Sequence, residues 1–318
     1  MSKIGIDIEK AKYFLQNGGL VGIPTETVYG LAANALNEEA VLHIFKAKNR
    51  PHFNPLILHT NSIEKVQSLV TEFPTWAETL ANRFWPGPLT LLLPRKKNIP
   101  DLVCAGLSHI AVRIPNHPLT LQLLADLNFP LAAPSANPFG YVSPTTASHV
   151  LSQLEESVDY ILDGGPSEIG LESTILGKEE GEDRIIVYRL GGLSLEELGQ
   201  GFLLKINTSS NPLAPGALKS HYAPKKKLET GKMDELIKIY EGKKLGIICF
   251  EKNWEVKEAI SLVLSSKGDL SEAARNLFST IRKLDQTDVD IILVEEHPDS
   301  FLGRAINDRL RRAASKED

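Results

Sequence analysis

Apolar and polar positions along the first two hundred residues predict helices and short strands of one α/β unit. Residues 8–15 have apolar side chains at helical spacing after Asp7, which can cap a helix that a glycine pair ends. A second helix is predicted over 37–48, with Asn37 as its cap. Short apolar runs bounded by proline or polar residues predict buried strands. These runs are 20–25, 55–60, 89–94, 110–115, 130–135, 160–165, 173–177 and 184–192.

The spacing of these strands is uneven, which favours a mixed, twisted α/β sheet over a regular βαβ repeat. Composition changes after this unit, where three prolines and a Ser/Asn cluster predict a linker. The linker is rich in Lys and contains no acidic residue, which fits either a solvated charge run or a functional segment. We therefore expect three parts: a first domain over 1–200, a linker over 201–228 and a second domain over 229–318.

The second domain is predicted to be small, α/β and Rossmann-like. Two strands and four helical patterns support this interpretation. The strands are 243–250 and 289–296, and the helical patterns are 232–241, 255–266, 270–284 and 301–314. The domain has no G-x-G-x-x-G motif, so a dinucleotide role is not supported.

Composition narrows the functional classes. A formal net charge of −5 argues against a protein that coats nucleic acid, although it permits a local basic site. Cys104 and Cys249 stand far apart without a metal-binding or disulfide pattern, which fits a reducing compartment. The beginning of the chain lacks the features of a signal peptide, and no apolar run reaches the length of a membrane span. We expect a cytoplasmic protein that does not enter membranes.

Positive charge gathers between Phe45 and Thr60, just before an apolar run. In an extended segment Lys48 and Arg50 would share one face and could hold a triphosphate, with Lys as a compact charge and Arg as a planar donor. The alternative is a solvated surface strip, and Lys46 fits that alternative best because it is still within the predicted helix.

Polar residues within or after apolar strands are further candidates. Ser135 and Asn137 follow a strand and can bind phosphate or ribose oxygens, or make turn hydrogen bonds. Arg113 and Arg189 lie inside apolar strands, where arginine needs either a structural carboxylate or an anionic ligand. Thr27 leaves a strand at an end where α/β sheets commonly bind ligands.

The common catalytic sequence motifs are missing. The sequence has no GxxxxGK[ST], HExxH or GxSxG motif and no obvious nucleophile. An enzyme built on these residues would work by positioning and electrostatics. The clustered cations and hydroxyls predict a pocket for a polyanion and a small carboxylate.

Six segments in fixed order resemble the YrdC-like family over roughly residues 5–200. They are GGLVGIPTETVYGLAANALN, FKAKNRPHFNPLILHT, FWPGPLTLLLP, VRIPNHP, PLAAPSANPFGYVSPT and LESTIL. The segments APGALKSHYAPKKKL and LGRAINDRLRRAAS resemble the longer, two-domain members, which are threonylcarbamoyl-AMP synthases. The resemblance implies a YrdC-like twisted mixed sheet with an open basic cavity, followed by the small Rossmann-like domain.

The resemblance also implies a reaction. L-threonine, bicarbonate (or CO2) and ATP give threonylcarbamoyl-AMP and diphosphate, for modification of the adenosine next to the anticodon in certain tRNAs. Other proteins are expected to carry out the transfer to tRNA, and weak tRNA or double-stranded RNA binding is an expectation of its own. Mg²⁺ is expected to be bound by the phosphates of ATP. The linker, around residues 208–222, is the candidate lid that protects the product from water.

The family pattern assigns site residues position by position. The expected catalytic residues are Lys48 and Arg50. The expected ATP-binding residues are Lys48, Arg50, Asn54, His109, Ser135, Asn137, Ser143, Arg189 and Tyr222. The expected threonine-binding residues are Thr27, His59, Arg113, Ala133 and Ser173.

Two positions depart from the family pattern. His109 stands where many relatives carry Thr or Ser, so a backbone contact to ATP would survive but a hydroxyl contact would not. Asn49 replaces a glycine between the two cations, which leaves the local loop shape open.

Three other functions stay in view. They are an RNA-binding module, a carbamoyl-adenylate enzyme of hydrogenase-maturation type and a regulatory nucleotide sensor. The second normally has extra metal-binding and acylphosphatase segments, which this sequence lacks.

Overall fold

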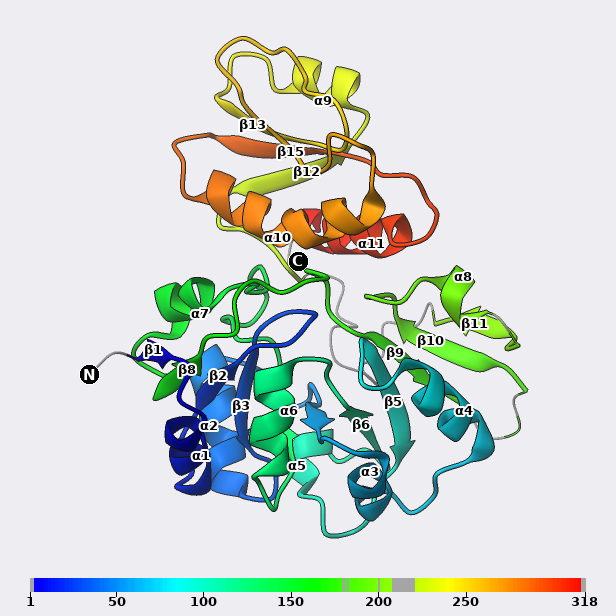
Figure 1. The fold of residues 1–318 in the computed structure, drawn as a ribbon. Coiled ribbons are helices and arrows are strands. Elements are labelled where there is room, and N and C mark those ends of the chain that lie inside the picture. Colours follow the sequence, from blue (N-terminus) through cyan, green and yellow to red (C-terminus); the bar gives the residue numbers. More distant parts are fainter. Residues whose placement is uncertain (1–2, 179–180, 182, 200, 208–220, 316–318) are drawn as a thin grey trace.

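The computed structural model describes residues 3–178, 181, 183–199, 201–207 and 221–315. The chain forms two α/β domains that lie one above the other, and the larger domain contains the N-terminal part of the chain (Figure 1). Within the described residues no helix has both the length and the apolar character to cross a bilayer.

The larger domain is built on an eleven-stranded sheet within the described residues. Parallel and antiparallel pairs both occur in it, as in β4/β6 and β5/β6, so the predicted mixed sheet is confirmed. In spatial order the strands are β1 (Ile4–Gly5), β8 (Tyr160–Leu162), β2 (Val21–Ile23), β3 (Gly30–Asn34), β7 (Leu131–Ala132), β4 (Ile57–His59), β6 (His109–Arg113), β5 (Leu89–Pro94), β9 (Thr174–Gly177), β10 (Ile185–Arg189) and β11 (Leu204–Ile206).

Helices cover this sheet and place its loops. Asp7 and Asn37 cap the first two helices as predicted, with side-chain oxygens that accept backbone N–H groups. The helices of this domain are α1 (Ile8–Gln16), α2 (Glu38–Lys48), α3 (Ile63–Leu69), α4 (Thr75–Phe84), α5 (Asp101–Cys104), α6 (Pro118–Ala125), α7 (Ala147–Leu154) and α8 (Leu195–Leu198). Sequence periodicity had predicted only the first two, because the others are short or follow irregular loops.

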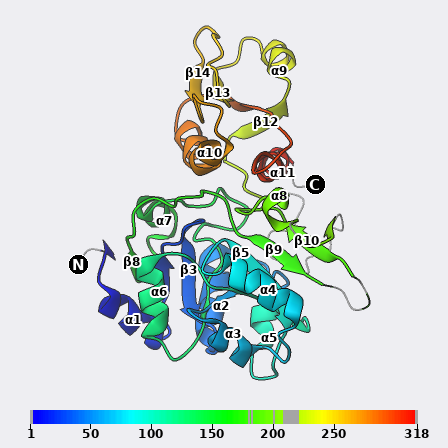
Figure 2. The same ribbon diagram turned by 45° about the vertical axis from the view of Figure 1, so that its right-hand side comes forward.

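The smaller domain has a parallel sheet, which fits the predicted Rossmann-like character. Its strands in spatial order are β12 (Lys227–Gly231), β15 (Ile291–Glu295), β13 (Leu245–Cys249) and β14 (Ile260–Val263). Its helices are α9 (Met233–Ile239), α10 (Leu270–Asp285) and α11 (Gly303–Ala314). In both ribbon views α10 and α11 lie on the side that faces the larger domain (Figures 1 and 2).

One predicted helix is wrong. The pattern over 255–266 indicated a helix, but the structure has strand β14 at Ile260–Val263. Its apolar residues are close enough in sequence to imitate helical spacing, and two of them are β-branched, which favours a strand. The parallel pairing of this segment with β13 makes it a strand, which its spacing alone could not decide.

The segment predicted as a linker also contains regular structure. Strand β11 lies within it and pairs with β10, so it extends the larger sheet, and β12 begins at its end. Residues 208–220, where most of the candidate lid falls, lie outside the described residues. The described remainder includes His221 and Tyr222, which are buried.

The two domains share a hydrophobic core. Val28, Val142 and Leu171 of the larger domain and Tyr222 of the linker belong to the same buried cluster as Leu277 and other residues of α10 and α11. Burial of one such apolar side chain contributes about 1.5–3 kcal/mol. The second domain is therefore docked on the first rather than tethered loosely.

We predict that Asn37→Ala lowers the free energy of unfolding by roughly 0.5–2 kcal/mol, because the first N–H groups of α2 lose their acceptor. Asn37 Oδ1 accepts from the N–H groups of Glu39 and Ala40 at 3.1 and 3.2 Å. Denaturant unfolding measures the loss. Asn37→Ser, which keeps a capping oxygen, should stay near the wild type, and an equal loss in both variants would contradict the capping role.

Candidate active site

One face of the central strands forms the floor of the site. Side chains alternate along a strand, so Leu58, Leu91, Val112 and Leu176 point into the helix-covered core. The intervening residues point to the opposite face. They are Ile57, His59, Thr90, Leu92, Ala111, Arg113 and Ile175.

A pocket opens on this face and is lined by many of the predicted site residues. Strand ends and the loops after them supply its walls, together with the linker. The predicted residues among its lining are Thr27, Arg50, His59, Arg113, Ala133, Ser135, Ser173, Arg189 and Tyr222. Segments far apart in sequence thus meet where the resemblance implied that they would.

Lys48 does not line this pocket. Its buried ammonium donates to the backbone carbonyls of Ser135, at 2.5 Å, and Asn137. Burial, together with the nearby Arg50 cation, holds the pKa of Lys48 well below its usual value. In this structure Lys48 therefore ties the end of α2 to the S-x-N segment, a different role from the direct phosphate contact that we expected.

Asn49 resolves the open question about the loop between the two cations. It has φ 50° and ψ 40°, the left-handed conformation that a glycine would adopt. Asparagine tolerates this conformation better than most residues. The replacement of glycine therefore leaves the turn intact, and α2 ends where Arg50 can turn toward the pocket.

Arg50 reaches the pocket and is held by neutral oxygens. Its Nη2 donates to Asn54 Oδ1 and to the carbonyl of Pro55, both at 2.8 Å, and its Nε donates to the carbonyl of Asn54 at 3.2 Å. Burial, reinforced by Arg189, lowers the pKa of Arg50 to about 9. Asn54 is thus a neighbour that orients Arg50 from behind the pocket wall.

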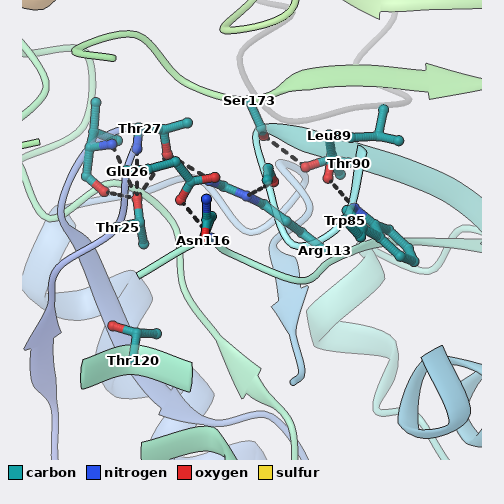
Figure 3. A network of polar contacts seen from close by, with 12 residues as sticks. Thr25, Glu26, Thr27, Trp85, Leu89, Thr90, Arg113, Asn116, Thr120 and Ser173 are labelled. Atoms are coloured by element: carbon teal, nitrogen blue, oxygen red, sulfur yellow. Dashed lines mark hydrogen bonds and ion pairs between the residues drawn. The ribbon is translucent and has the colours of Figure 1, made fainter. Parts of the chain in front are cut away.

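Arg113 is the centre of a buried polar network (Figure 3). Its Nη2 lies 2.7 Å from Glu26 Oε1, and both side chains are 4% exposed. Its Nη1 donates to Thr27 Oγ1 at 2.9 Å, and its Nε to the carbonyl of Gly87 at 3.2 Å. Glu26 also accepts from the N–H of Asn116 at 3.0 Å. The strand arginine therefore has a carboxylate partner and is fixed at the pocket.

Ser173 connects Arg189 to the floor of the site. Its hydroxyl lies 2.7 Å from Thr90 Oγ1, and Arg189 Nη2 donates to it at 3.0 Å. A bulge between Val187 and Arg189 interrupts the alternation of β10. Bulges re-aim side chains, which explains how Arg189 joins the pocket although Val187 faces the core.

His59 is neutral in this environment. Burial and the neighbouring Arg113 lower its pKa to about 3. Its Nδ1 lies 3.1 Å from the carbonyl of Ile57, which fits an N–H at Nδ1. The other ring nitrogen would then be a hydrogen-bond acceptor, suited to a hydroxyl or ammonium donor of a ligand.

The described part of the linker closes one side of the pocket. Tyr222 has φ 66°, a conformation that is uncommon for an aromatic residue and is often found at functional sites. Its ring contacts His221 at a centroid distance of 4.2 Å and stacks on Phe278 of α10 at 5.7 Å. Packing against the second domain thus holds both linker residues at the pocket.

Asn137 and Ser143 lie behind the pocket, not on its lining. The amide of Asn137 donates to the carbonyls of Pro138 and Tyr141, and Ser143 Oγ donates to Glu172. Both residues order the segment between β7 and α7. The structure does not place either one where it would touch a ligand in the described pocket.

His109 is the one predicted site residue that lies in a separate hollow. It begins β6, and this hollow also includes Leu92, Pro94 and Tyr188. His109 and Arg113 share one strand face and are separated by about 13 Å, at ~3.3 Å per residue. An apolar strip on the same face, formed by Ile57, Leu92, Ala111, Ile175 and Tyr188, runs between the two hollows.

Sequence comparison decides the family. A relative named threonylcarbamoyl-AMP synthase from Pyrococcus abyssi is 42% identical over 96% of this chain and 94% of its own length. The chain belongs to the threonylcarbamoyl-AMP synthase family. A relative of the same name from Bacillus subtilis is 39% identical over 96% of this chain and 92% of its own length.

Family models and a solved structure agree with this membership of the synthase family. A model of the Sua5, YciO and YrdC proteins, described as "Telomere recombination", matches residues 13–191. A model described as the C-terminal domain of threonylcarbamoyl-AMP synthase matches residues 192–315. The crystal structure of P. abyssi Sua5 complexed with L-threonine has a TM-score of 0.88 and 40% identity, and the match covers 96% of this chain and 94% of that one.

Reasoning from the sequence missed the roles of two site residues of this synthase-family chain. Glu172 lines the pocket, and Arg309 of α11 forms an ion pair with it at 2.8 Å. Both lie inside segments that carried the family resemblance. Nothing in the spacing of the sequence could pair them, because 137 positions separate them.

Metal ligands are not apparent in the described residues, where no three His, Cys, Asp or Glu side chains are grouped closely enough to hold an ion. Glu172 on the pocket lining and Glu26 beside Arg113 are each paired with an arginine. The described residues therefore offer no group of protein ligands for Mg²⁺.

We predict that Glu26→Ala lowers the free energy of unfolding by about 3–5 kcal/mol, because Arg113 then becomes a buried cation without its carboxylate. Urea denaturation with matched buffers measures the difference. Glu9→Ala is the control, since Glu9 is exposed and its pair with Lys12 at 3.5 Å should contribute less than ~1 kcal/mol. Similar losses in the two variants would contradict the importance of the buried pair.

Proposed function

We propose that this chain joins L-threonine, bicarbonate or CO2, and ATP into threonylcarbamoyl-AMP and diphosphate. The main support is the gathering of Arg50, Arg113 and Arg189 at one pocket, in a member of this family. A relative of known structure was crystallised with L-threonine, which supports the same amino acid as substrate here. Arg113 is the proposed partner of its carboxylate.

The threonine end of the pocket has matching chemistry. Among the described residues Arg113 donates hydrogen bonds from Nε and Nη1, and its Nη2 lies beside Glu26 as an ion pair. Since a guanidinium has five N–H donors, it retains N–H groups for the carboxylate of threonine. Thr27 and Ser173 supply hydroxyls, neutral His59 supplies an acceptor, and Ala133 leaves room beside them. We propose that these five residues bind L-threonine.

The ATP end is proposed to extend along the strand face. Arg50 and Arg189 would contact the phosphates, with Ser135 and Tyr222 beside them. The apolar strip would then carry the adenine ring toward His109, whose backbone or ring would contact the nucleotide. Asn54, Asn137 and Ser143 would support this site indirectly, through the contacts described above.

The chemistry needs no protein nucleophile. The threonine nitrogen attacks the carbon of CO2 and loses a proton, which gives a carbamate. A carbamate oxygen then attacks the α-phosphorus, the bond from this phosphorus to the bridging oxygen breaks, and diphosphate leaves with the electron pair. The carbamate, the triphosphate and the leaving diphosphate are all anionic, so cations that offset this charge lower the barrier of the second step. We propose Arg50 as the catalytic cation at the phosphates. Lys48, which we expected to be catalytic as well, is proposed to act through the S-x-N segment, whose carbonyls its ammonium holds.

The product is a mixed anhydride that water destroys, so a tRNA-modifying partner would take it up next. We propose that this partner is a separate protein and that tRNA binds this chain weakly at most. The structure contains two buried cysteines that form no disulfide, which supports a reducing compartment and hence the cytoplasm as the place of the reaction.

We predict that Arg50→Ala abolishes threonine-dependent diphosphate release, with at least about a hundredfold loss in kcat/KM, because a cation at the phosphates is removed. Lys48→Ala should lose turnover to a similar extent. The assay is run with and without bicarbonate. Arg95→Ala, a cation at the partly exposed Arg95–Asp101 pair, should keep full activity. Near-normal release by Arg50→Ala would refute the phosphate assignment, and ATP binding by the wild type without threonine-dependent release would favour a nucleotide sensor.

We predict that Ala111→Leu raises the KM for ATP by roughly tenfold, or about 1.4 kcal/mol, because the added carbons fill the apolar strip where adenine would lie. The KM for threonine should change much less, since Arg113 lies two residues further along the strand. Initial-rate kinetics with each substrate varied separately gives both constants. Equal increases in the two constants would contradict the proposed path of the nucleotide.

A further inference from the structure

Arg309 reaches from the second domain to the wall of the pocket. Its Nε donates to Glu172 Oε2 at 2.8 Å, and its Nη2 donates to the carbonyl of Leu190 at 2.7 Å. Its Nη1 lies 2.7 Å from Asp308, its neighbour on α11. Arg309 is 1% exposed and Glu172 is 5% exposed. This is a buried ion pair between domains, with one end at the pocket lining.

Glu172 is an unfavourable neighbour for an anionic substrate unless a cation neutralises it. It lines the same pocket as Arg50 and Arg189, where we propose the phosphates. Burial raises the pKa of Glu172, but Arg309 and Arg189 outweigh burial and the pKa is lowered overall. The carboxylate is therefore an anion. Without Arg309 it would repel phosphate and compete for Arg189.

Arg309 also supports an aromatic wall of the pocket. Its guanidinium carbon lies 4.9 Å from the centre of the Tyr222 ring, in cation–π range, while Phe278 stacks on the same residue. Nearby, Arg282 of α10 donates to the carbonyl of Ser143 at 3.3 Å, and the hydroxyl of Ser143 donates to Glu172. Two helices of the second domain thus hold Tyr222 and Glu172 from behind.

We propose that Arg309 is a positioning residue of the reaction, through which the second domain completes the nucleotide pocket. It neutralises Glu172 and fixes Tyr222, so that ATP meets an excess of positive charge and a preformed wall. This inference rests on the proposed function, because it assumes that ATP is bound between Arg50 and Arg189.

The test compares single and double variants of the full chain. Arg309→Met should raise the KM for ATP at least about tenfold and the KM for threonine less, because a buried carboxylate at the phosphates has lost its cation. Glu172→Gln combined with Arg309→Met should recover most of that loss, since the uncompensated charge is gone. Arg304→Met is the matched control: it breaks another interdomain pair, with Glu196 at 2.6 Å, which is partly exposed. It should leave both constants unchanged.

A wild-type KM for ATP in Arg309→Met would overturn the inference, and so would a double variant no better than the single one. An equal rise of the KM for ATP in Arg304→Met would also overturn it. The effect would then come from weaker docking of the two domains and not from Arg309 itself. If Arg309→Met does not fold, Arg309→Lys and the double variant carry the comparison. Calorimetric ATP binding by each variant gives a readout that does not require threonine-dependent turnover, so failure of the proposed reaction and failure of the positioning role are distinguishable.

Discussion

The site depends on how buried positive charge is compensated. Several arginines lie near one another with little access to bulk water, and each needs an anion or a set of oriented oxygens. Arg113 has Glu26, and Arg309 has Glu172, whereas Arg50 is held by neutral oxygens of residues 54 and 55. Compensation is therefore uneven across the pocket. Positive charge stays in excess at the end with Arg50, and a polyanion would be attracted most strongly to that end.

The alternation of side chains on the central strands explains how core and site coexist. The same strands that send leucine and valine into the helix-covered core send His59, Thr90 and Arg113 to the opposite face. A change of register by one residue would bury the polar set among the helices and expose the apolar one. Core packing thus fixes the site register, and the bulge in β10 is a local exception that brings Arg189 to the same pocket.

Much of the fold and of the candidate site could be predicted from local sequence. The expectations that were wrong or incomplete have physical causes. Caps and apolar runs located α1, α2 and most central strands, because these signals act within a few residues. The strand at β14 was taken for a helix, since short apolar runs fit both periods and only pairing with β13 separates them. Most of the site residues that the family resemblance assigned line one pocket in the structure. The roles of Glu172 and Arg309 depended on domain docking, which no local pattern describes.

The position of Lys48 shows why residue type alone does not give a role. We expected Lys48 and Arg50 to share one face of an extended segment, as two cations aimed at one anion, but Lys48 is the last residue of α2. The structure instead gives Lys48 two carbonyl partners, and burial together with Arg50 disfavours its charge. Two adjacent cations in a closed space raise each other's energy, so one is satisfied by backbone dipoles while the other faces the pocket. Lys48 then ties the end of α2 to the S-x-N segment, and so links the turn that carries Arg50 to the segment that carries Ser135.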